Sequence, residues 1–217
     1  MLTNVFFDLD GTLTDSKEGI VKCMHYALDK LNCPCPAEFE DDRFIGPPLR
    51  VTFKKFFNTD DEILIEKAVS LYRERFSTIG LFENKVYPGI PEMLSSLHKK
   101  SFKLYVVTSK AKIYADRIIE HFQLSTWFND VYGSDLGGRF DNKADLITFI
   151  LNNRKLRVEE TVMIGDKKED IMAGKANRTR TIGVTYGYGT KGEISDAAPD
   201  YICGSPSEIQ KLVMKIR

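Results

Sequence analysis

Two aspartates, Asp8 and Asp10, follow a short apolar run near the start of the chain. The run contains Val5, Phe6 and Phe7, and β-branched and aromatic residues of this kind are typical of a buried parallel strand. Residues two apart in an extended chain point to the same side, so both carboxylates should leave the strand end together. Burying two like charges is costly unless a cation or a chemical task balances them. The stretch therefore indicates a metal-binding or catalytic site, with a solvated strand end as the alternative.

The residues after this pair decide against calcium binding. Gly11 permits a sharp turn, and Thr12 adds a hydroxyl within it. The pattern Asp-x-Asp also opens EF-hand loops, which require glycine at the sixth position and glutamate at the twelfth. Counted from Asp8, those positions hold Leu13 and Gly19, which excludes an EF-hand loop.

Composition limits the classes of partner. The chain has 217 residues, with 31 Lys and Arg against 31 Asp and Glu, so its formal net charge is zero. This balance argues against a broad surface for nucleic acid or acidic membranes. No apolar run approaches the length of a bilayer span, and no secretory signal precedes the first strand. We expect a cytosolic protein with reduced cysteines, because Cys33-Pro-Cys35 has neither zinc-knuckle nor thioredoxin spacing.

The periodicity of the chain divides it into two parts. Apolar residues at three-to-four spacing predict only helices in residues 16–81. After that, predicted strands alternate with predicted helices, which is typical of a doubly wound, Rossmann-like parallel sheet. We therefore expect an α/β core of residues 1–15 and 82–217, with an inserted helical-bundle cap of residues 16–81. The expected strands are 103–107, 130–132, 161–164, 179–184 and 201–202, and the expected helices include 37–43, 91–100, 111–122, 143–153, 168–177, 191–195 and 206–216.

Three further groups follow strands of this predicted sheet and should meet Asp8 at its carboxyl edge. Thr108 and Ser109 end one strand, and the Thr108 hydroxyl could bind an anion or cap the next helix. Lys143 begins a predicted helix, where the helix dipole disfavours a cation and a bound anion would compensate. A solvated lysine is the alternative.

The last group lies on one helical turn. Asp166 ends a buried strand and Asp170 follows four residues later, so both carboxylates can face one point. A helix N-cap followed by a first-turn acid is the structural alternative.

These groups resemble, in chain order, the four motifs of the haloacid dehalogenase (HAD) superfamily. The matching residues are Asp8-Leu-Asp-Gly-Thr12, Thr108, Lys143 and Gly165-Asp166…Asp170. The helical block resembles the cap of subclass I members, and phosphoglycolate-phosphatase-like and 5′-nucleotidase-like members look most similar. Lys143-Ala-Asp-Leu146 departs from the Lys-Pro-x-Pro often found in phosphoglycolate phosphatases, which leaves the substrate open.

The resemblance implies a role for each motif residue. Asp8 would be the nucleophile, and Asp10 the general acid and base. A second acid at Asp10 favours phosphate chemistry over dehalogenation. The implied phosphate-binding residues are Gly11, Thr12, Thr108, Ser109 and Lys143. The implied ligands of Mg²⁺ are Asp8, Asp10, Asp166 and Asp170. Arg43, Arg50 and Lys54 are cap candidates for contact with a second anionic group of the substrate.

The sequence thus predicts a Mg²⁺-dependent phosphatase, a phosphoric monoester hydrolase that works through an aspartyl phosphate. The implied substrates are small phosphomonoesters, such as phosphoglycolate, a nucleoside 5′-monophosphate or a sugar phosphate. A phosphosugar mutase of the β-phosphoglucomutase type and a non-catalytic binding or regulatory protein are the alternatives. We expect no nucleic-acid or membrane partner, and a monomer or homodimer. The glycine pattern in residues 187–192 comes too late in the chain for dinucleotide binding.

Overall fold

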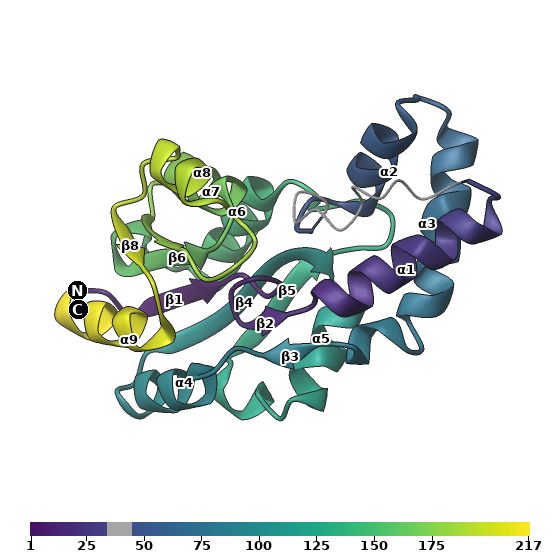
Figure 1. Ribbon diagram of the computed structural model, residues 1–217. Coiled ribbons are helices and arrows are strands. Elements are labelled where there is room, and N and C mark those ends of the chain that lie inside the picture. The colour runs from purple at the N-terminus through teal and green to yellow at the C-terminus, as the bar shows by residue number, and fades with distance from the viewer. Residues whose placement is uncertain (34–44) are drawn as a thin grey trace.

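A parallel β-sheet forms the centre of the protein (Figure 1). The computed structural model describes residues 1–33 and 45–217, and within them six strands pair in parallel in the order β5-β4-β1-β6-β7-β8. These strands are β1 (Asn4–Phe7), β4 (Lys103–Ala111), β5 (Asp130–Ser134), β6 (Thr161–Gly165), β7 (Arg180–Val184) and β8 (Tyr201–Cys203). The helices around the sheet are α4 (Ile90–Lys99), α5 (Lys112–His121), α6 (Lys143–Arg154), α7 (Lys168–Ala176), α8 (Lys191–Asp196) and α9 (Pro206–Lys215).

The first strand occupies the switch point of this sheet. β1 pairs with β4 on one side and with β6 on the other, so the chain builds outward in both directions from it. Phe7, its last residue, is in register with Val106 of β4 and Ile164 of β6. Open α/β sheets bind ligands where the strand order reverses, at the carboxyl ends of the strands. The doubly wound parallel sheet predicted from the sequence is therefore present.

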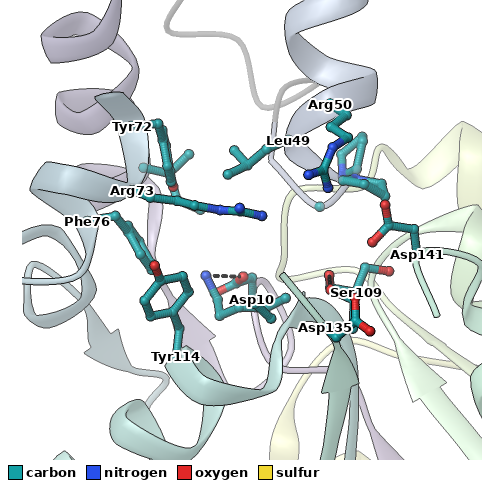
Figure 2. Close-up of a pocket in the computed structure, with 17 residues that line it drawn as sticks. Asp10, Leu49, Arg50, Tyr72, Arg73, Phe76, Ser109, Tyr114, Asp135 and Asp141 are labelled. Atoms are coloured by element: carbon teal, nitrogen blue, oxygen red, sulfur yellow. Dashed lines mark hydrogen bonds and ion pairs between the residues drawn. The ribbon is translucent and has the colours of Figure 1, made fainter. Parts of the chain in front are cut away.

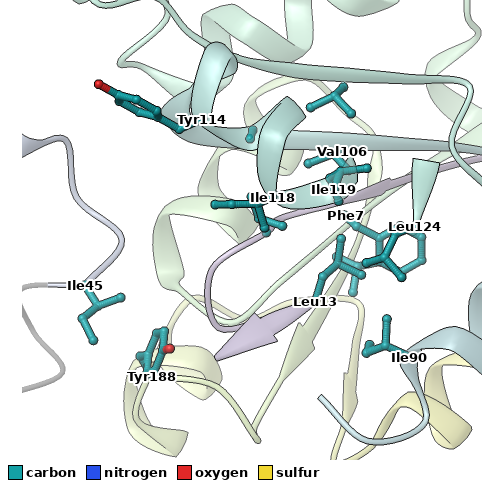
Figure 3. Close-up of a cluster of buried hydrophobic side chains, with 14 of the residues drawn as sticks. Phe7, Leu13, Ile45, Ile90, Val106, Tyr114, Ile118, Ile119, Leu124 and Tyr188 are labelled. Carbon is teal, nitrogen blue, oxygen red and sulfur yellow. The ribbon is translucent and has the colours of Figure 1, made fainter. Parts of the chain in front are cut away.

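Alternate residues of the buried strands build the two faces of the core. Val5 and Phe7 point to the face covered by α4, α5 and α9, and Phe6 points to the face covered by α6 and α7. Each residue is fully buried, as expected for a parallel strand with helices on both sides. Leu13, in the turn after β1, lies among Phe7, Ile118 and Leu124 (Figure 3). This packing ties the turn that follows the strand to the core.

A helical unit stands beyond the carboxyl edge of the sheet (Figure 1). It consists of α1 (Lys17–Lys30), α2 (Leu49–Phe57) and α3 (Glu62–Phe76). The chain enters this unit through β2 (Thr14–Asp15) and leaves it through β3 (Lys85–Val86), and these two strands pair antiparallel. A pocket separates α2 and α3 from the end of β4 (Figure 2). The sequence predicted the helices but not the two-stranded ribbon, because strands of two residues carry no readable periodicity.

The remaining differences from the sequence-based expectation are local. β4 continues through Thr108 and Ser109 to Ala111, and α5 begins only at Lys112. The alternative that Thr108 caps a helix is therefore wrong.

Two further expectations from the sequence concern a short helix and membrane-spanning segments. The helix expected over residues 37–43 lies outside the described residues. Within the part of the chain that the structure describes, no helix combines the length and the apolar character needed to cross a bilayer.

Candidate active site

The carboxylate of Asp8 lies directly beyond β1 and is almost fully buried. Its Oδ1 atom is 2.8 Å from Nζ of Lys143, close enough for an ion pair. Lys143 is the first residue of α6 and also pairs with Asp170. Asn142 caps that helix by accepting a hydrogen bond from the amide of Ala144. Two carboxylates therefore balance the lysine charge that the helix dipole disfavours.

Asp166 is held from two directions at the end of β6. Oδ1 accepts a hydrogen bond of 3.0 Å from the hydroxyl of Thr12, and Oδ2 accepts one of 2.8 Å from the amide of Tyr188. Gly11 has a φ of +82°, and a Cβ atom there would stand 2.2 Å from Oδ2 of Asp166. Only glycine fits this close approach. The amide of Gly11 donates to the carbonyl of Thr14, and the amide of Thr12 donates to that of Leu9.

A glycine-rich loop after β7 completes the support of Asp166. A Cβ atom at Gly187 would stand 2.2 Å from the carbonyl oxygen of Gly11, and one at Gly189 would stand 1.8 Å from that of Asp166. The hydroxyl of Tyr186 also donates to the carbonyl of Thr12. These glycines let the loop backbone press against the acid, which is a packing role. The sequence singled the loop out by its glycines but did not indicate this contact.

Asp170 contacts both the lysine beside Asp8 and the backbone that follows Asp166. One oxygen pairs with Lys143, and the other accepts a hydrogen bond of 3.0 Å from the amide of Lys167. Gly165 makes room for it, since a Cβ atom there would stand 2.2 Å from the carboxylate carbon. The predicted spacing of Asp166 and Asp170 thus places both carboxylates next to Asp8.

The three acids form a set that suits a hard cation. Oxygen atoms of Asp8, Asp166 and Asp170 lie within 4.8 Å of one another. Burial raises the pKa of Asp8 and of Asp166 to about 6, and the charge of Asp8 adds to the effect on Asp166. Burial also raises the pKa of Asp170, although Lys143 opposes this. Carboxylate oxygens keep a second lone pair when they accept one hydrogen bond, so the set fits a Mg²⁺ ion.

Asp10 faces a different partner from Asp8. Its Oδ2 atom is 2.8 Å from Nζ of Lys110, and the side chains are 10 and 8% exposed. The lysine ammonium also lies over the ring of Phe76 in α3, 4.5 Å from the ring centre. Oδ1 of Asp10 is buried and has no hydrogen-bond partner among the described residues. Asp10 therefore keeps one oxygen available, and Lys110 links it to the helical unit. Lys110 is not among the site residues predicted from the sequence, although it directly follows Thr108 and Ser109.

Two cavities meet at these carboxylates. The inner pocket, of about 80 Å³, lies under α2 and α3, and its lining includes Asp10, Arg50, Arg73, Ser109, Lys110 and Tyr114 (Figure 2). The outer cleft, of about 370 Å³, is lined by residues that include Asp8, Ser109, Asn142, Lys143, Asp170 and Met172. Asp8 lines only the outer cleft and Asp10 only the inner pocket, whereas Ser109 lines both. The boundary between the cavities is where a group could touch both aspartates.

The other predicted site residues differ in position. Thr108 is buried at this edge, and its hydroxyl accepts a hydrogen bond from the amide of Lys110. Arg50 lines the inner pocket but pairs with Glu66 through two hydrogen bonds. Lys54 is exposed on α2, pairs with Asp60 and lines neither cavity. Arg43 lies outside the described residues.

Comparison with known proteins gives a consistent family assignment. The family described as haloacid dehalogenase-like hydrolase matches residues 5–184. A 5′-nucleotidase of Pseudomonas aeruginosa is 39% identical over 210 residues, which are 97% of this chain and 95% of that protein. A phosphoglycolate phosphatase of Vibrio parahaemolyticus is 27% identical over 216 residues, 96% of this chain and 95% of that one. The crystal structure of a predicted phosphatase from Clostridium acetobutylicum superposes with a TM-score of 0.94 and 39% identity, and the match covers 99% of this chain and 100% of that one.

The raised pKa values predict how pH affects metal binding. Between the ordinary pKa of aspartate and about 6, the folded, metal-free protein holds protons on Asp8 and Asp166 that the unfolded chain has lost. The free energy of unfolding of the metal-free protein should therefore fall as pH rises through this range. A divalent cation must displace those protons, so Mg²⁺ should raise the Tm more at about pH 7.5 than at about pH 5. Calorimetry at both pH values checks this, and an equal or larger Tm rise at the lower pH would contradict the fit.

The close approach of Gly11 to Asp166 predicts a backbone effect on the same site. Gly11→Ala should displace the Asp166 carboxylate and strain the positive φ, which alone costs roughly 1–2 kcal/mol. The Tm rise caused by Mg²⁺ should be largely lost. The control is Gly192→Ala, where a Cβ atom would meet only Oγ1 of Thr190 at 3.9 Å. An unchanged Mg²⁺ response in the Gly11 variant, or the same loss in the control, would refute this account of Gly11.

Proposed function

The chain belongs to the haloacid dehalogenase-like hydrolase family, and on this premise we propose that it is a Mg²⁺-dependent phosphatase of small phosphomonoesters. The observation that carries the proposal is the pair Asp8 and Asp10 at the switch point of the sheet, each facing its own lysine and its own cavity. Asp8 can then attack phosphorus while Asp10 donates and later accepts a proton. The names of the relatives support a phosphate ester as the substrate, since they include a 5′-nucleotidase and a phosphoglycolate phosphatase.

In the first step, a carboxylate oxygen of Asp8 forms a bond to phosphorus, and the bond from phosphorus to the ester oxygen breaks. The departing oxygen takes a proton from Asp10 and leaves as an alcohol. Oδ1 of Asp10 suits this transfer because no described residue forms a hydrogen bond with it. The enzyme then carries an aspartyl phosphate at Asp8, and Asp10 is a carboxylate again.

In the second step, water attacks the phosphorus of the aspartyl phosphate while Asp10 accepts a proton from it. The bond from phosphorus to Asp8 breaks, which releases inorganic phosphate and regenerates the carboxylate. Asp10 acts as acid in the first step and as base in the second.

Basic and hydroxyl side chains around Asp8 would hold the phosphoryl group. Lys143 lies beside Asp8, and Thr108 and Ser109 are at the adjoining end of β4. Their donors can neutralise the charge that develops on the phosphoryl oxygens. Asp8 and Asp166, with Asp170 beside them, would hold Mg²⁺. When bound, the ion would reduce the repulsion between the anionic nucleophile and the anionic substrate.

The helical unit would act as a cap over this site. We propose that residues 16–81 form the cap and that residues 1–15 and 82–217 form the catalytic core. The ribbon of β2 and β3 joins the two, and α2 and α3 border the inner pocket. A cap that closes over the pocket would exclude water from the first step and admit only small esters.

The nucleophile assignment predicts the result of a conservative substitution. Asp8→Asn keeps the shape of the side chain but removes its negative charge, so turnover should fall by roughly 10³-fold or more. Burial raises the pKa of Asp8, which means that its charge is not needed for folding, and the Tm should not fall. Phosphate release and calorimetry measure the two effects. Phosphatase activity equal to that of the wild type would eliminate Asp8 as the nucleophile.

The metal assignment predicts a dependence on added ions. In a screen of soluble phosphomonoesters, phosphate release should require Mg²⁺ and stop when EDTA is present in excess. Restoring Mg²⁺ should restore the rate. Net release of inorganic phosphate also separates hydrolysis from transfer within a phosphosugar. A rate unaffected by EDTA would contradict the metal assignment.

A further inference from the structure

The proposed reaction fixes where the departing half of the substrate must lie. Asp10 has to contact the ester oxygen that leaves, and Asp10 lines the inner pocket, whereas Asp8 lines the outer cleft. An ester bound across the boundary therefore puts its phosphoryl group toward Asp8 and its leaving group in the inner pocket. The side chains of the inner pocket then decide which leaving groups are accepted.

Three cationic side chains among the described residues line the inner pocket, and two of them are paired with acids. Lys110 pairs with Asp10, and Arg50 donates two hydrogen bonds to the carboxylate of Glu66. Arg73, from α3, has no carboxylate partner among the described residues. Its Nη2 atom donates to the carbonyl oxygen of Leu136, at 3.2 Å. Arg73 therefore brings into the pocket a positive charge that no ion pair with a described residue offsets.

The position of Arg73 suits it to bind something in the pocket. Its guanidinium extends from α3 into the space above Asp10 (Figure 2). Its Nε atom is buried and has no hydrogen-bond partner in the described part of the chain. A buried donor without an acceptor is costly, more so when it is charged. A guanidinium also presents its Nε and Nη donors side by side, in the geometry that a carboxylate or phosphate accepts.

Two described acids respond to the charge of Arg73 but do not pair with it. Burial raises the pKa of Asp141, and the charges of Arg50 and Arg73 partly oppose the rise. Hydrogen bonds from Arg50 lower the pKa of Glu66, with a smaller contribution from Arg73. Both acids are thus close enough to feel the charge of Arg73, but neither forms an ion pair with it. No described residue takes the position at Nε, which leaves it to a ligand.

We propose that Arg73 determines specificity by binding a second anionic group, a carboxylate or a phosphate, on the leaving group of the substrate. This inference rests on the proposed phosphatase function. The lining of the inner pocket includes both Asp10 and Arg73, so a leaving group held there can reach the two side chains at once. Arg73 therefore selects doubly anionic esters.

Matched esters test the proposal. The substrates are 2-phosphoglycolate, which carries a carboxylate, ethylene glycol bisphosphate, which carries a second phosphate, and 2-hydroxyethyl phosphate, which is neutral at that end. The wild type should show a higher kcat/KM for at least one anionic ester than for the neutral one. Arg73→Gln should reduce this preference by about 10- to 100-fold, the range expected for loss of a charge-assisted hydrogen bond. Arg73→Lys, which keeps the charge, should retain more of the preference than Arg73→Gln.

Arg50→Gln is the matched comparison. Arg50 lines the same pocket and also donates to the carbonyl of Leu136, but its charge is paired with Glu66. The preference for anionic esters should therefore change less in this variant than in Arg73→Gln. Calorimetry confirms that each variant is folded. The carboxylate and phosphate esters, compared separately, identify which anion is bound.

Three results would overturn the proposal. The first is a wild type without preference for either anionic ester while it still hydrolyses the neutral one, which leaves the phosphatase function intact. The second is an equal loss of activity on all three esters in Arg73→Gln, which would show that Arg73 only joins α3 to Leu136. The third is an equal or larger loss of preference in Arg50→Gln. Absence of phosphate release from every ester would overturn the phosphatase function itself, and this inference with it.

Discussion

The repulsion between four carboxylates at one edge of the sheet is the constraint on which the rest of the site depends. Asp8, Asp10, Asp166 and Asp170 are all buried, and only two lysine side chains, Lys110 and Lys143, form ion pairs with them among the described residues. Four negative and two positive charges leave an excess of negative charge, which a divalent cation would offset. The pKa values show the same imbalance, because burial and like charges raise those of Asp8 and Asp166. The glycines around Asp166 leave the room that lets these groups lie this close together.

Different partners give two neighbouring acids different tasks in the proposed mechanism. Asp8 faces Lys143, from the helix after β5, and opens to the outer cleft. Asp10 faces Lys110, from β4, and opens to the inner pocket under the helical unit. Because Lys110 also lies over the ring of Phe76, the second acid is in contact with the proposed cap through a single side chain. The nucleophile and the proton donor are thus close in the chain, and their different partners and cavities give them different roles.

Most of the fold and the motif residues could be predicted from the sequence, because both depend on regular patterns. Alternating strands and helices indicated the parallel sheet, and polar residues after strand ends indicated where Asp8, Thr108, Lys143 and Asp166 would meet. What could not be predicted depends on contacts between distant segments. Lys110 and Arg73 have no periodic signal, and their roles follow from which cavity each one lines. Likewise, nothing local in the glycine loop shows that it packs against Asp166.

We propose that a divalent cation between Asp8 and Asp166 balances this buried charge. A crystal structure of the protein grown with Mn²⁺, with anomalous diffraction recorded, locates that ion directly. We expect an anomalous peak about 2.1 Å from a carboxylate oxygen of each residue, with Lys143 still beside Asp8. No peak there at saturating Mn²⁺, or a peak at another acidic cluster alone, would contradict the account.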